Sequence, residues 1–263
     1  MKDRLTLTGD AGPIYADQSS LFGQPDVVGW RNGDLECEVV ERDLANKIIV
    51  ENHYSGKFYN ATYIHLGAFW KGELVGIAQY GYAMNPTSQE SVVPGTGPKE
   101  YLELNRLWID DSMPKNSESA FLALTMKYIK ATTPVRWVQS FADERCKLFG
   151  AVYQACSFIY CGEHTSVFWE IDREMFHNSI MTRDPSLAPS AKYAQDNRER
   201  ATAHNLRQFR YVKFLRPKYK RDLALPSLPY PKPAVGLEEK NPADQPGSVG
   251  AIPTHRSTEQ AAA

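Results

Sequence analysis

The sequence predicts an α/β protein in which helices flank a central sheet. Strand and helix patterns alternate between residues 35 and 180, in the order β-α-β-β-β-α-β-α-β. The chain has 263 residues, of which 42% are hydrophobic and 11% are aromatic, enough for one large domain or two small ones with a sizeable core. This composition excludes a wholly disordered or collagen-like chain.

The first part of this region predicts a strand, a helix and a hairpin. Leu35–Glu41 is a short strand, and Asp43 caps a helix whose apolar residues recur at the spacing of one helical face. Two further strands, Ala61–Trp70 and Leu74–Tyr82, are separated only by the turn Lys71-Gly72-Glu73. These two strands are therefore expected to pair as an antiparallel hairpin.

The next strand is joined to a helix by a polar loop. Tyr101–Ile109 alternates as a strand, so Leu104 and Arg106 are expected to face one way and Glu103 the other. A polar loop follows, and then a helix runs from Ser117 to about residue 130, with its apolar residues on one face. A strand that leads into a helix start in this way places polar groups at the edge of the sheet.

The remaining elements complete the predicted sheet. Val135–Phe141 is a strand, and a helix lies around Phe149–Ser157. Phe158–Tyr160 and Ser166–Ile171 are expected to be the last two strands. The mixture of strands and helices predicts an α/β sandwich and excludes an all-β fold.

Composition divides the chain into four parts. Residues 1–34 form an N-terminal extension without sustained periodicity, residues 35–180 the core domain, and residues 181–232 a basic extension. The Pro- and Gly-containing tail, residues 233–263, is expected to be disordered. No apolar run approaches the ~20 residues needed to span a bilayer, and no secretory signal is expected. Four cysteines without a C-x-x-C pair indicate free thiols in a reducing cytoplasm.

The net charge of −1 hides a local concentration of positive charge. Nine basic residues and one acidic residue, Glu199, lie between positions 198 and 221, which gives this tract a charge of 9 − 1 = +8. The basic residues are Arg198, Arg200, Arg207, Arg210, Lys213, Arg216, Lys218, Lys220 and Arg221. With aromatic residues between them, they favour nucleic-acid binding, because basic groups neutralise phosphates and aromatic rings stack on unpaired bases. A solvated amphipathic segment packed on the domain is the alternative.

Two groups of residues are candidates for chemistry. Asn116, Ser117 and Ser119 begin a helix, where backbone N–H groups bind phosphate, although a simple N-cap is equally compatible with these residue types. His53 and Tyr54 place a titratable imidazole beside a phenol, and Asp143 follows a strand directly. Each of these three also has a structural interpretation: an exposed histidine, a packed tyrosine and a capping aspartate.

Several long segments, in order, resemble the phage Mom DNA-modification proteins. The resemblance covers residues 39–232 and is carried by Glu51-Asn-His-Tyr-Ser55, Tyr63-Ile-His-Leu-Gly67, Glu103-Leu-Asn-Arg-Leu-Trp108, Met113-Pro-Lys-Asn-Ser-Glu-Ser119, Trp137-Val-Gln-Ser-Phe-Ala-Asp-Glu-Arg-Cys146, Val152-Tyr-Gln-Ala155, the basic tract and Leu228-Pro-Tyr-Pro-Lys232. These proteins are similar to the GNAT acyltransferases. The resemblance therefore implies a GNAT-like fold with a mixed, mostly antiparallel sheet and a basic C-terminal extension.

The resemblance also implies a function. Mom proteins convert adenine in phage DNA to N6-carbamoylmethyladenine, which protects the genome from host restriction. It implies catalytic roles for His53, Tyr54 and Asp143, with His53 and Asp143 as ligands of iron(II), and a donor site that includes Arg106 and Tyr153. The donor is acetyl-CoA or another nucleotide-bearing molecule, since residues 114–119 lack the Q-x-x-G-x-G/A loop of ordinary GNAT enzymes.

The implied partner is double-stranded DNA in the cytoplasm of the bacterial host, with the adenine flipped out of the helix. A GNAT-type N-acyltransferase that acts on a protein or small molecule is one alternative, and the basic tract argues against it. A non-enzymatic nucleic-acid-binding protein is the other, and it leaves His53, Tyr54 and Asp143 without a purpose. No D-P-P-Y-like element of an adenine methyltransferase is present. The oligomeric state stays open, with a homodimer among the alternatives.

Overall fold

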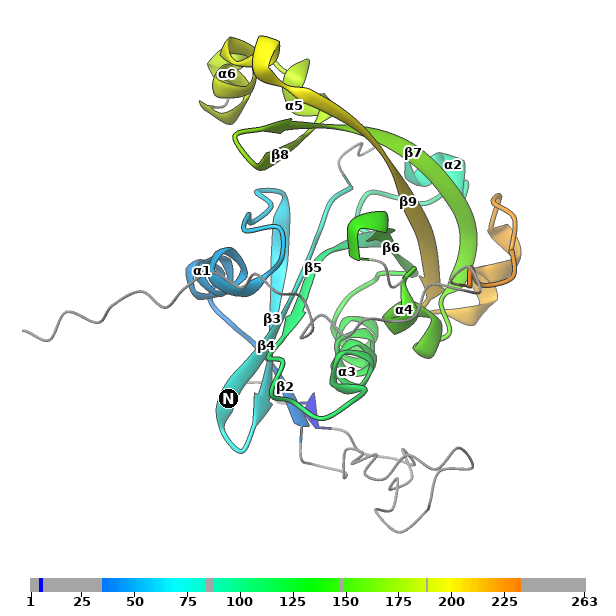
Figure 1. Ribbon diagram of the computed structural model, residues 1–263. Coiled ribbons are helices and arrows are strands. Elements are labelled where there is room, and N and C mark those ends of the chain that lie inside the picture. Colours follow the sequence, from blue (N-terminus) through cyan, green and yellow to red (C-terminus); the bar gives the residue numbers. More distant parts are fainter. Residues whose placement is uncertain (1–4, 7–34, 84–87, 147–148, 188, 233–263) are drawn as a thin grey trace, which may run out of the picture. The chain divides into compact units, whose positions relative to one another are not determined.

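The computed structural model describes residues 5–6, 35–83, 88–146, 149–187 and 189–232. Within this part, a nine-stranded sheet has the order β1-β2-β3-β4-β5-β6-β9-β7-β8 (Figure 1). The strands are β1 (Leu5–Thr6), β2 (Leu35–Val39), β3 (Thr62–Trp70), β4 (Glu73–Gly81), β5 (Tyr101–Ile109), β6 (Trp137–Asp143), β7 (Ile159–Ile171), β8 (Glu174–His177) and β9 (Thr202–Phe214). All pairs are antiparallel except β5 with β6. The predicted mixed, mostly antiparallel sheet is confirmed.

Helices cover both faces of this sheet. The α-helices are α1 (Arg42–Asn52), α2 (Gln89–Val92), α3 (Ser117–Thr132), α4 (Ala151–Ala155), α5 (Asn178–Met181) and α6 (Pro189–Asp196). Short 3-10 helices include η1 (Glu144–Cys146) and η4 (Pro217–Asp222). On β4, Gln79 donates a hydrogen bond to Asn46 of α1, and the next residue, Tyr80, hydrogen-bonds Thr125 of α3. Because successive strand residues point to opposite faces, α1 and α3 lie on opposite sides of the sheet.

The main core lies between the sheet and α3. Phe121, Leu122, Leu124 and Ile129 of this helix are wholly buried and pack in one cluster with apolar residues of the strands. On the other face, Ala45 and Ile49 of α1 are likewise buried. Burying a large apolar side chain contributes about 1.5–3 kcal/mol, so these helices fix the sheet that carries the site. None of the helices in the described ranges is long and apolar enough to cross a membrane.

The predicted hairpin is formed by β3 and β4. Its two turn residues, Lys71 and Gly72, have φ values of 51° and 84°. Positive φ at both central residues is the geometry of the type I′ turn, whose twist matches that of the flanking strands. The register then places Trp70 opposite Glu73. The turn conformation and the alternation of the two strands therefore both favour this hairpin.

A bulge at Asn105 changes the faces of β5. Gln79 pairs with Arg106 and Tyr80 with Leu104, so the register skips Asn105. Because Tyr80 contacts α3 and Gln79 contacts α1, Leu104 faces α3 and Arg106 faces α1. The expectation that Leu104 and Arg106 share a face is therefore wrong, because the extra residue reverses the alternation.

The parallel strands β5 and β6 pair only at their beginnings. Tyr101, Leu102 and Glu103 of β5 oppose Trp137, Val138 and Gln139 of β6. After these residues, β5 continues beside β4 and β6 continues beside β9 (Figure 1). The two strands thus separate, and the residues that follow Glu103 and Gln139 border the opening between them.

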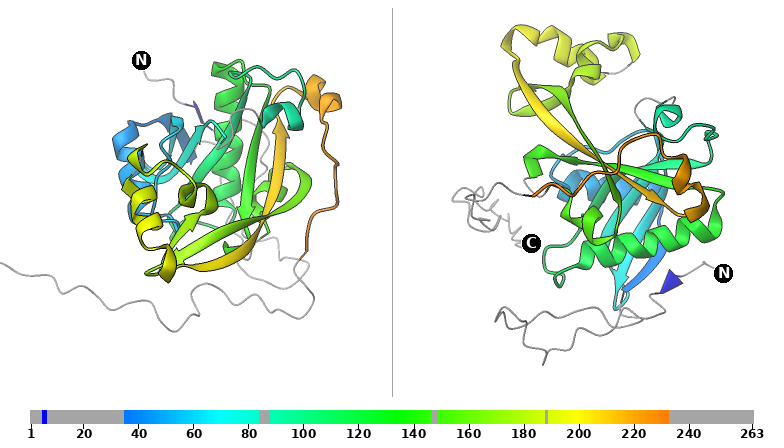
Figure 2. Two further views of the ribbon diagram at one scale, coloured as in Figure 1. Left: turned by 90° about the horizontal axis from the view of Figure 1, so that it is seen from above. Right: turned by 90° about the vertical axis from the view of Figure 1, so that its right-hand side faces the viewer.

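The last part of the chain differs from the prediction. The two strands predicted at Phe158–Tyr160 and Ser166–Ile171 are one continuous strand, β7. In the region assigned to the basic extension, β9 pairs with both β6 and β7, so the boundary expected at residue 180 cuts through one sheet (Figure 2). The dense positive charge of β9 obscured its strand pattern. The first helix also begins at Arg42, with Asp43 in its first turn rather than at its cap.

Both predicted tails fall largely or wholly outside the described residues. Of the predicted N-terminal extension, residues 1–34, the structure describes Leu5 and Thr6, which form β1 and pair with β2. The predicted C-terminal tail, residues 233–263, lies beyond the described part. All four cysteines are free thiols.

Candidate active site

His53 and Tyr54 lie directly after α1. The N–H of His53 donates to the carbonyl of Ile49 and closes the helix. The N–H of Ser55 donates to Nδ1 of His53 at 3.2 Å, so Nδ1 is an acceptor and the neutral ring carries its proton on Nε2. Burial and the nearby charge of Arg106 lower the pKa of His53 to about 4. His53 is therefore neutral at physiological pH and presents an N–H donor.

Tyr54 lies between His53 and the end of β6. Its ring centroid is 4.3 Å from that of His53. Although the residue as a whole is 64% exposed, its hydroxyl lies beside Asp143 and hydrogen-bonds the thiol of Cys146. Desolvation, reinforced by these two neighbours, raises the pKa of Tyr54. The phenol thus stays protonated, and it brings the segment after α1 to the segment after β6.

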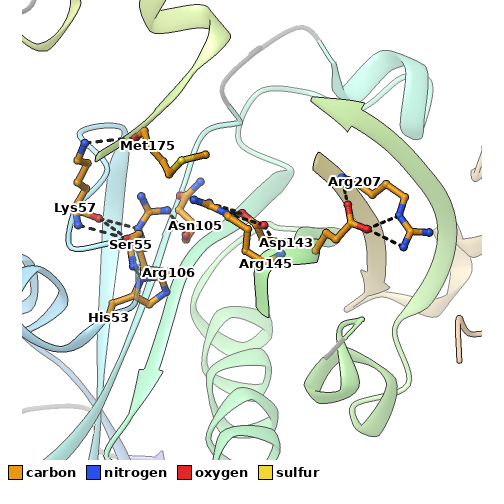
Figure 3. A network of polar contacts seen from close by, with 10 residues as sticks. His53, Ser55, Lys57, Asn105, Arg106, Asp143, Arg145, Met175 and Arg207 are labelled. Atoms are coloured by element: carbon orange, nitrogen blue, oxygen red, sulfur yellow. Dashed lines mark hydrogen bonds and ion pairs between the residues drawn. The ribbon is translucent and has the colours of Figure 1, made fainter. Parts of the chain in front are cut away.

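Arg106 ties β5 to the loop that follows α1. Its Nε donates to the carbonyl of Lys57 at 2.9 Å, and its Nη1 donates to the carbonyl of Asn105 at 2.7 Å. The bulge in β5 turns Arg106 toward this loop. Its charge acts on both His53 and Tyr54. Figure 3 shows Arg106 within the polar network that runs from His53 toward Asp143.

Asp143 is the last residue of β6 and is only 6% exposed. The side chain of Arg145 donates to both carboxylate oxygens, with Nε at 3.0 Å from each, and the backbone N–H of Arg145 donates to Oδ1 at 2.9 Å (Figure 3). Burial alone would raise the pKa of Asp143, but these hydrogen bonds and the charge of Arg145 outweigh it and lower the pKa. Asp143 is therefore a firmly ionised carboxylate.

Glu103 is a candidate that we did not predict from the sequence. Its carboxylate accepts from Nδ2 of Asn105 at 3.0 Å and from Nε2 of Gln139 at 2.9 Å. Burial raises its pKa to about 7, although these hydrogen bonds and two nearby guanidinium groups oppose the shift. A carboxyl group with this pKa is suited to proton transfer at neutral pH. The sequence feature that could have indicated this residue is a glutamate between Leu102 and Leu104 in a predicted strand.

The predicted donor site lies at the start of α3. Asn116 precedes the helix with φ at 68°, and its side chain does not cap the helix. The hydroxyl of Ser117 donates back to the carbonyl of Pro114, and that of Ser119 donates to the carbonyl of Asn116 at 2.9 Å. The backbone N–H of Ser117 donates to the carbonyl of Pro114 at 3.2 Å, whereas Asn116 does not cap the helix, which leaves the N–H groups of Glu118 and Ser119 for an anion.

Tyr153, the other predicted donor-site residue, lies in the core. It is 9% exposed, and its hydroxyl is 2.9 Å from that of Ser140. Its ring packs against Phe158 and Tyr211. Since the Ser140 hydroxyl also donates to the carbonyl of Leu104, this pair bridges β5 and β6 where the two strands separate.

The arrangement of His53 and Asp143 does not fit the implied iron(II) site. In the ranges that the structure covers, no group of three or more His, Cys, Asp and Glu side chains is placed to hold a metal ion. Arg145 already engages both oxygens of Asp143, and Ser55 engages Nδ1 of His53. Non-haem iron typically needs two histidines and a carboxylate. We therefore derive no step through iron.

Many side chains of the basic tract have partners within the fold. Arg200 pairs with Asp172, Arg207 pairs with Glu144 and Glu163, and Lys213 and Arg216 donate to backbone carbonyls. Arg210 lies over the ring of Phe141. The other basic residues are exposed: Arg198 and, on η4, Lys218, Lys220 and Arg221, of which Arg221 lies 3.6 Å from the carboxylate of the adjacent Asp222. The sequence alone did not show which basic residues are paired within the fold, because most of their partners lie in distant segments of the chain.

Comparisons with known proteins found a relative in sequence and several similar structures. Methylcarbamoylase Mom of Escherichia phage Mu is 42% identical over 210 residues, which cover 78% of this chain and 87% of that protein. Two solved structures are similar at low identity. Arabidopsis thaliana NAA60 in complex with acetyl-CoA is 10% identical with a TM-score of 0.45, over 68% of this chain and 98% of that chain. An N-acetyltransferase from Staphylococcus aureus is 14% identical with a TM-score of 0.42, over 69% and 99%. Residues 34–232 match the Mom protein family, and the chain therefore belongs to it.

Proposed function

We propose that this chain is a DNA-modifying transferase that converts adenine in phage DNA to N6-carbamoylmethyladenine. It would act in the cytoplasm of the bacterial host and protect the phage genome from restriction. Its relative in phage Mu is named a methylcarbamoylase. The observation that carries the proposal for this chain is the partly buried Glu103, which is held by Asn105 and Gln139, has a pKa of about 7 and lies near the charge of Arg106 beside His53 and Tyr54.

The chemistry of adenine explains the need for such a group. The N6 lone pair is delocalised into the ring, so the amine is a weak nucleophile and must lose a proton as it reacts. The donor must carry a carbamoylmethyl group with a leaving group on its methylene carbon, which acetyl-CoA does not. A new bond forms between N6 and this carbon, the bond from the carbon to its leaving group breaks, the leaving group departs with that electron pair, and Glu103 takes the N6 proton. Asp143 is a poorer base, because its ion pair with Arg145 holds its pKa low.

The other residues would hold and polarise the reactants. Neutral His53 can donate a hydrogen bond from Nε2, and Tyr54 can donate from its phenol. Arg106 fixes the loop that carries both, and the Asp143–Arg145 pair holds a guanidinium beside Tyr54. Donors fixed in advance stabilise developing negative charge at little reorganisation cost. The adenine must leave the duplex to reach them, at a cost of a few kcal/mol.

The start of α3 is the proposed site for the donor's phosphates. Asn116→Asp would place a negative charge beside the free N–H groups, so we expect acetyl-CoA to bind about tenfold more weakly. The same charge stabilises a helix N-terminus, so the melting temperature should stay or rise. Calorimetric titration with acetyl-CoA measures the first effect. Asn116→Gly, which keeps the positive φ, is the matched control. If Asn116→Asp bound acetyl-CoA as tightly as the wild type, Asn116 would be only a residue that precedes the helix and not part of a donor site.

The exposed cations of η4 are proposed to bind DNA phosphates. Replacing Lys218, Lys220 and Arg221 together by alanine should reduce the slope of log K against log salt by about 0.9 for each phosphate that the protein no longer neutralises. Arg207→Gln should leave this slope unchanged, because Arg207 is already paired with two glutamates. Fluorescence anisotropy with duplex DNA at several salt concentrations provides the measurement. An unchanged slope in the triple variant would show that DNA binds at another surface of the protein.

A restriction assay tests the proposed function. Plasmid DNA from cells that express the protein should resist nucleases that are sensitive to N6 substitution, whereas DNA from cells that express Glu103→Gln should be cut. Full cutting of both samples in several hosts would refute the proposal. Acylation of a protein or small molecule without any change in the DNA would favour the N-acyltransferase alternative.

A further inference from the structure

The outer halves of β7 and β9 form a two-stranded arm. Asp143, at the end of β6, pairs with Gln208 of β9, and residues 202–207 of β9 pair with β7 alone. At its far end the arm carries β8, α5 and α6, which bury a small apolar cluster of their own (Figures 1 and 2). Lys57, in the loop after α1, pairs with Glu174 of β8 at 2.9 Å. The arm therefore begins at Asp143 and ends beside the loop that follows Tyr54.

The register places one face of the arm on the same side as Asp143. Asp143, Gln208 and His164 oppose one another on three neighbouring strands, and cross-strand partners share a face. Phe168 is four residues further along β7 than His164 and therefore lies on this face too. Phe168 in turn opposes His177 of β8. One continuous face thus leads from Asp143 to the end of the arm.

Partly exposed rings and guanidinium groups alternate on this face. We call the four rings the arm platform: Phe141, His164, Phe168 and His177. Phe141 meets His164 edge-on at 5.4 Å between centroids, and Phe168 meets His177 in the same way at 5.1 Å. Arg210 lies over Phe141 at 5.1 Å, and Arg145 lies over Phe168 at 4.9 Å. Of the carboxylates nearby, Asp143 is paired with Arg145, and Glu170 is hydrogen-bonded to His204 at 2.9 Å.

We propose that the arm platform binds unpaired DNA nucleotides next to the target adenine. Every base has a flat π-face that stacks on aromatic side chains, and the guanidinium group of Arg210 attracts the phosphates, whereas that of Arg145 is already paired with Asp143. A closed duplex presents base edges and phosphates, but not base faces, so partly exposed rings suit an opened strand. The inference rests on the proposed function, because it assumes that the strand opens where the adenine leaves the helix.

Binding measurements with two DNA substrates test the platform. Fluorescence anisotropy compares a fully paired duplex with the same sequence in which three nucleotides, including an adenine, are unpaired. We expect the wild-type protein to bind the opened DNA more tightly. Phe168→Leu, which keeps an apolar side chain but removes the ring, should weaken binding of the opened DNA about tenfold and leave binding of the paired duplex unchanged. Phe168→Tyr should bind like the wild type.

A matched control lies next to Phe168. Trp169→Leu removes a ring that points to the opposite face, where it hydrogen-bonds Asn178, and it should not change the preference for opened DNA. Melting temperatures identify any variant that fails to fold. If Phe168→Leu does not fold, Phe141→Leu is measured in its place. Equal affinity of wild type and folded Phe168→Leu for opened DNA would overturn the platform. The platform would also be overturned if Trp169→Leu lost as much affinity for opened DNA as Phe168→Leu. The same holds if Phe168→Leu weakened only the binding of acetyl-CoA.

These measurements need neither a donor nor turnover. A wild-type protein that prefers opened DNA through Phe168 but makes no modified adenine would refute the proposed function alone. Conversely, modified adenine made by a protein whose Phe168→Leu variant binds opened DNA normally would refute the platform alone.

Discussion

Glu103→Gln should lower the rate of adenine modification by about 10²- to 10⁴-fold, the usual contribution of a general base. The amide keeps the size of the side chain, and its oxygen can accept from either Asn105 or Gln139, while the other of these two must turn its free amide oxygen toward the new N–H. The amide cannot take the N6 proton. The measurement is the fraction of modified deoxyadenosine against time after induction, with protein amounts matched. DNA affinity should change little, because Glu103 is not among the proposed phosphate contacts.

The pH dependence provides an independent check of Glu103. In cell extracts, wild-type activity should rise as the pH passes through about 7, since only the ionised carboxylate accepts a proton. The pKa is raised above its ordinary value of 4.5, so the folded state binds the proton more tightly than the unfolded state. The contribution of Glu103 to the free energy of unfolding should therefore fall as the pH rises from 4.5 to about 7, whereas the lowered pKa of His53 contributes in the opposite direction between about 4 and 6.5, so the difference between wild type and variant is compared. Glu103→Gln should lose this contribution, and an identical pH profile in wild type and variant would contradict the assignment.

Two substitutions of His53 separate its chemical role from its structural one. His53→Ala removes both the Nε2 donor and the acceptor for the N–H of Ser55, whereas His53→Asn offers an oxygen acceptor near the position of Nδ1. We expect both variants to lose about 10²- to 10³-fold in modification rate, as for the loss of one fixed transition-state donor. Duplex DNA affinity should remain within about twofold by anisotropy. Near-normal activity in His53→Asn would show that the histidine only shapes the turn after α1.

Local patterns predicted the parts of the fold that local interactions determine. The turn at Lys71 and Gly72 was predictable because a short segment with a glycine separates two strand patterns, and glycine adopts positive φ without strain. The bounds of Tyr101–Ile109 were also correct, because alternation and flanking loops mark them. The bulge at Asn105 was not predictable, since strict alternation leaves no place for an extra residue.

Long-range pairing explains what the sequence did not reveal about the site. The strand β9 pairs with β6, which lies more than sixty residues earlier, so its charged residues were interpreted as an extension rather than as part of the sheet. Similarly, Arg207 pairs with Glu144 across a separation of 63 residues. Glu103 was missed because its unusual pKa comes from burial in the assembled sheet, which no local pattern encodes. Tyr54 lies near both His53 and Asp143, and the expected meeting of all three in one catalytic cleft stays a prediction.

Mass spectrometry of nucleosides tests the central claim most directly. DNA from cells that express the wild-type protein, digested to nucleosides, should contain deoxyadenosine with a carbamoylmethyl group on N6. DNA from cells that express Glu103→Gln at the same level should contain it only in traces. Unmodified deoxyadenosine alone in the wild-type sample, from several hosts and with folded protein present, would contradict the account.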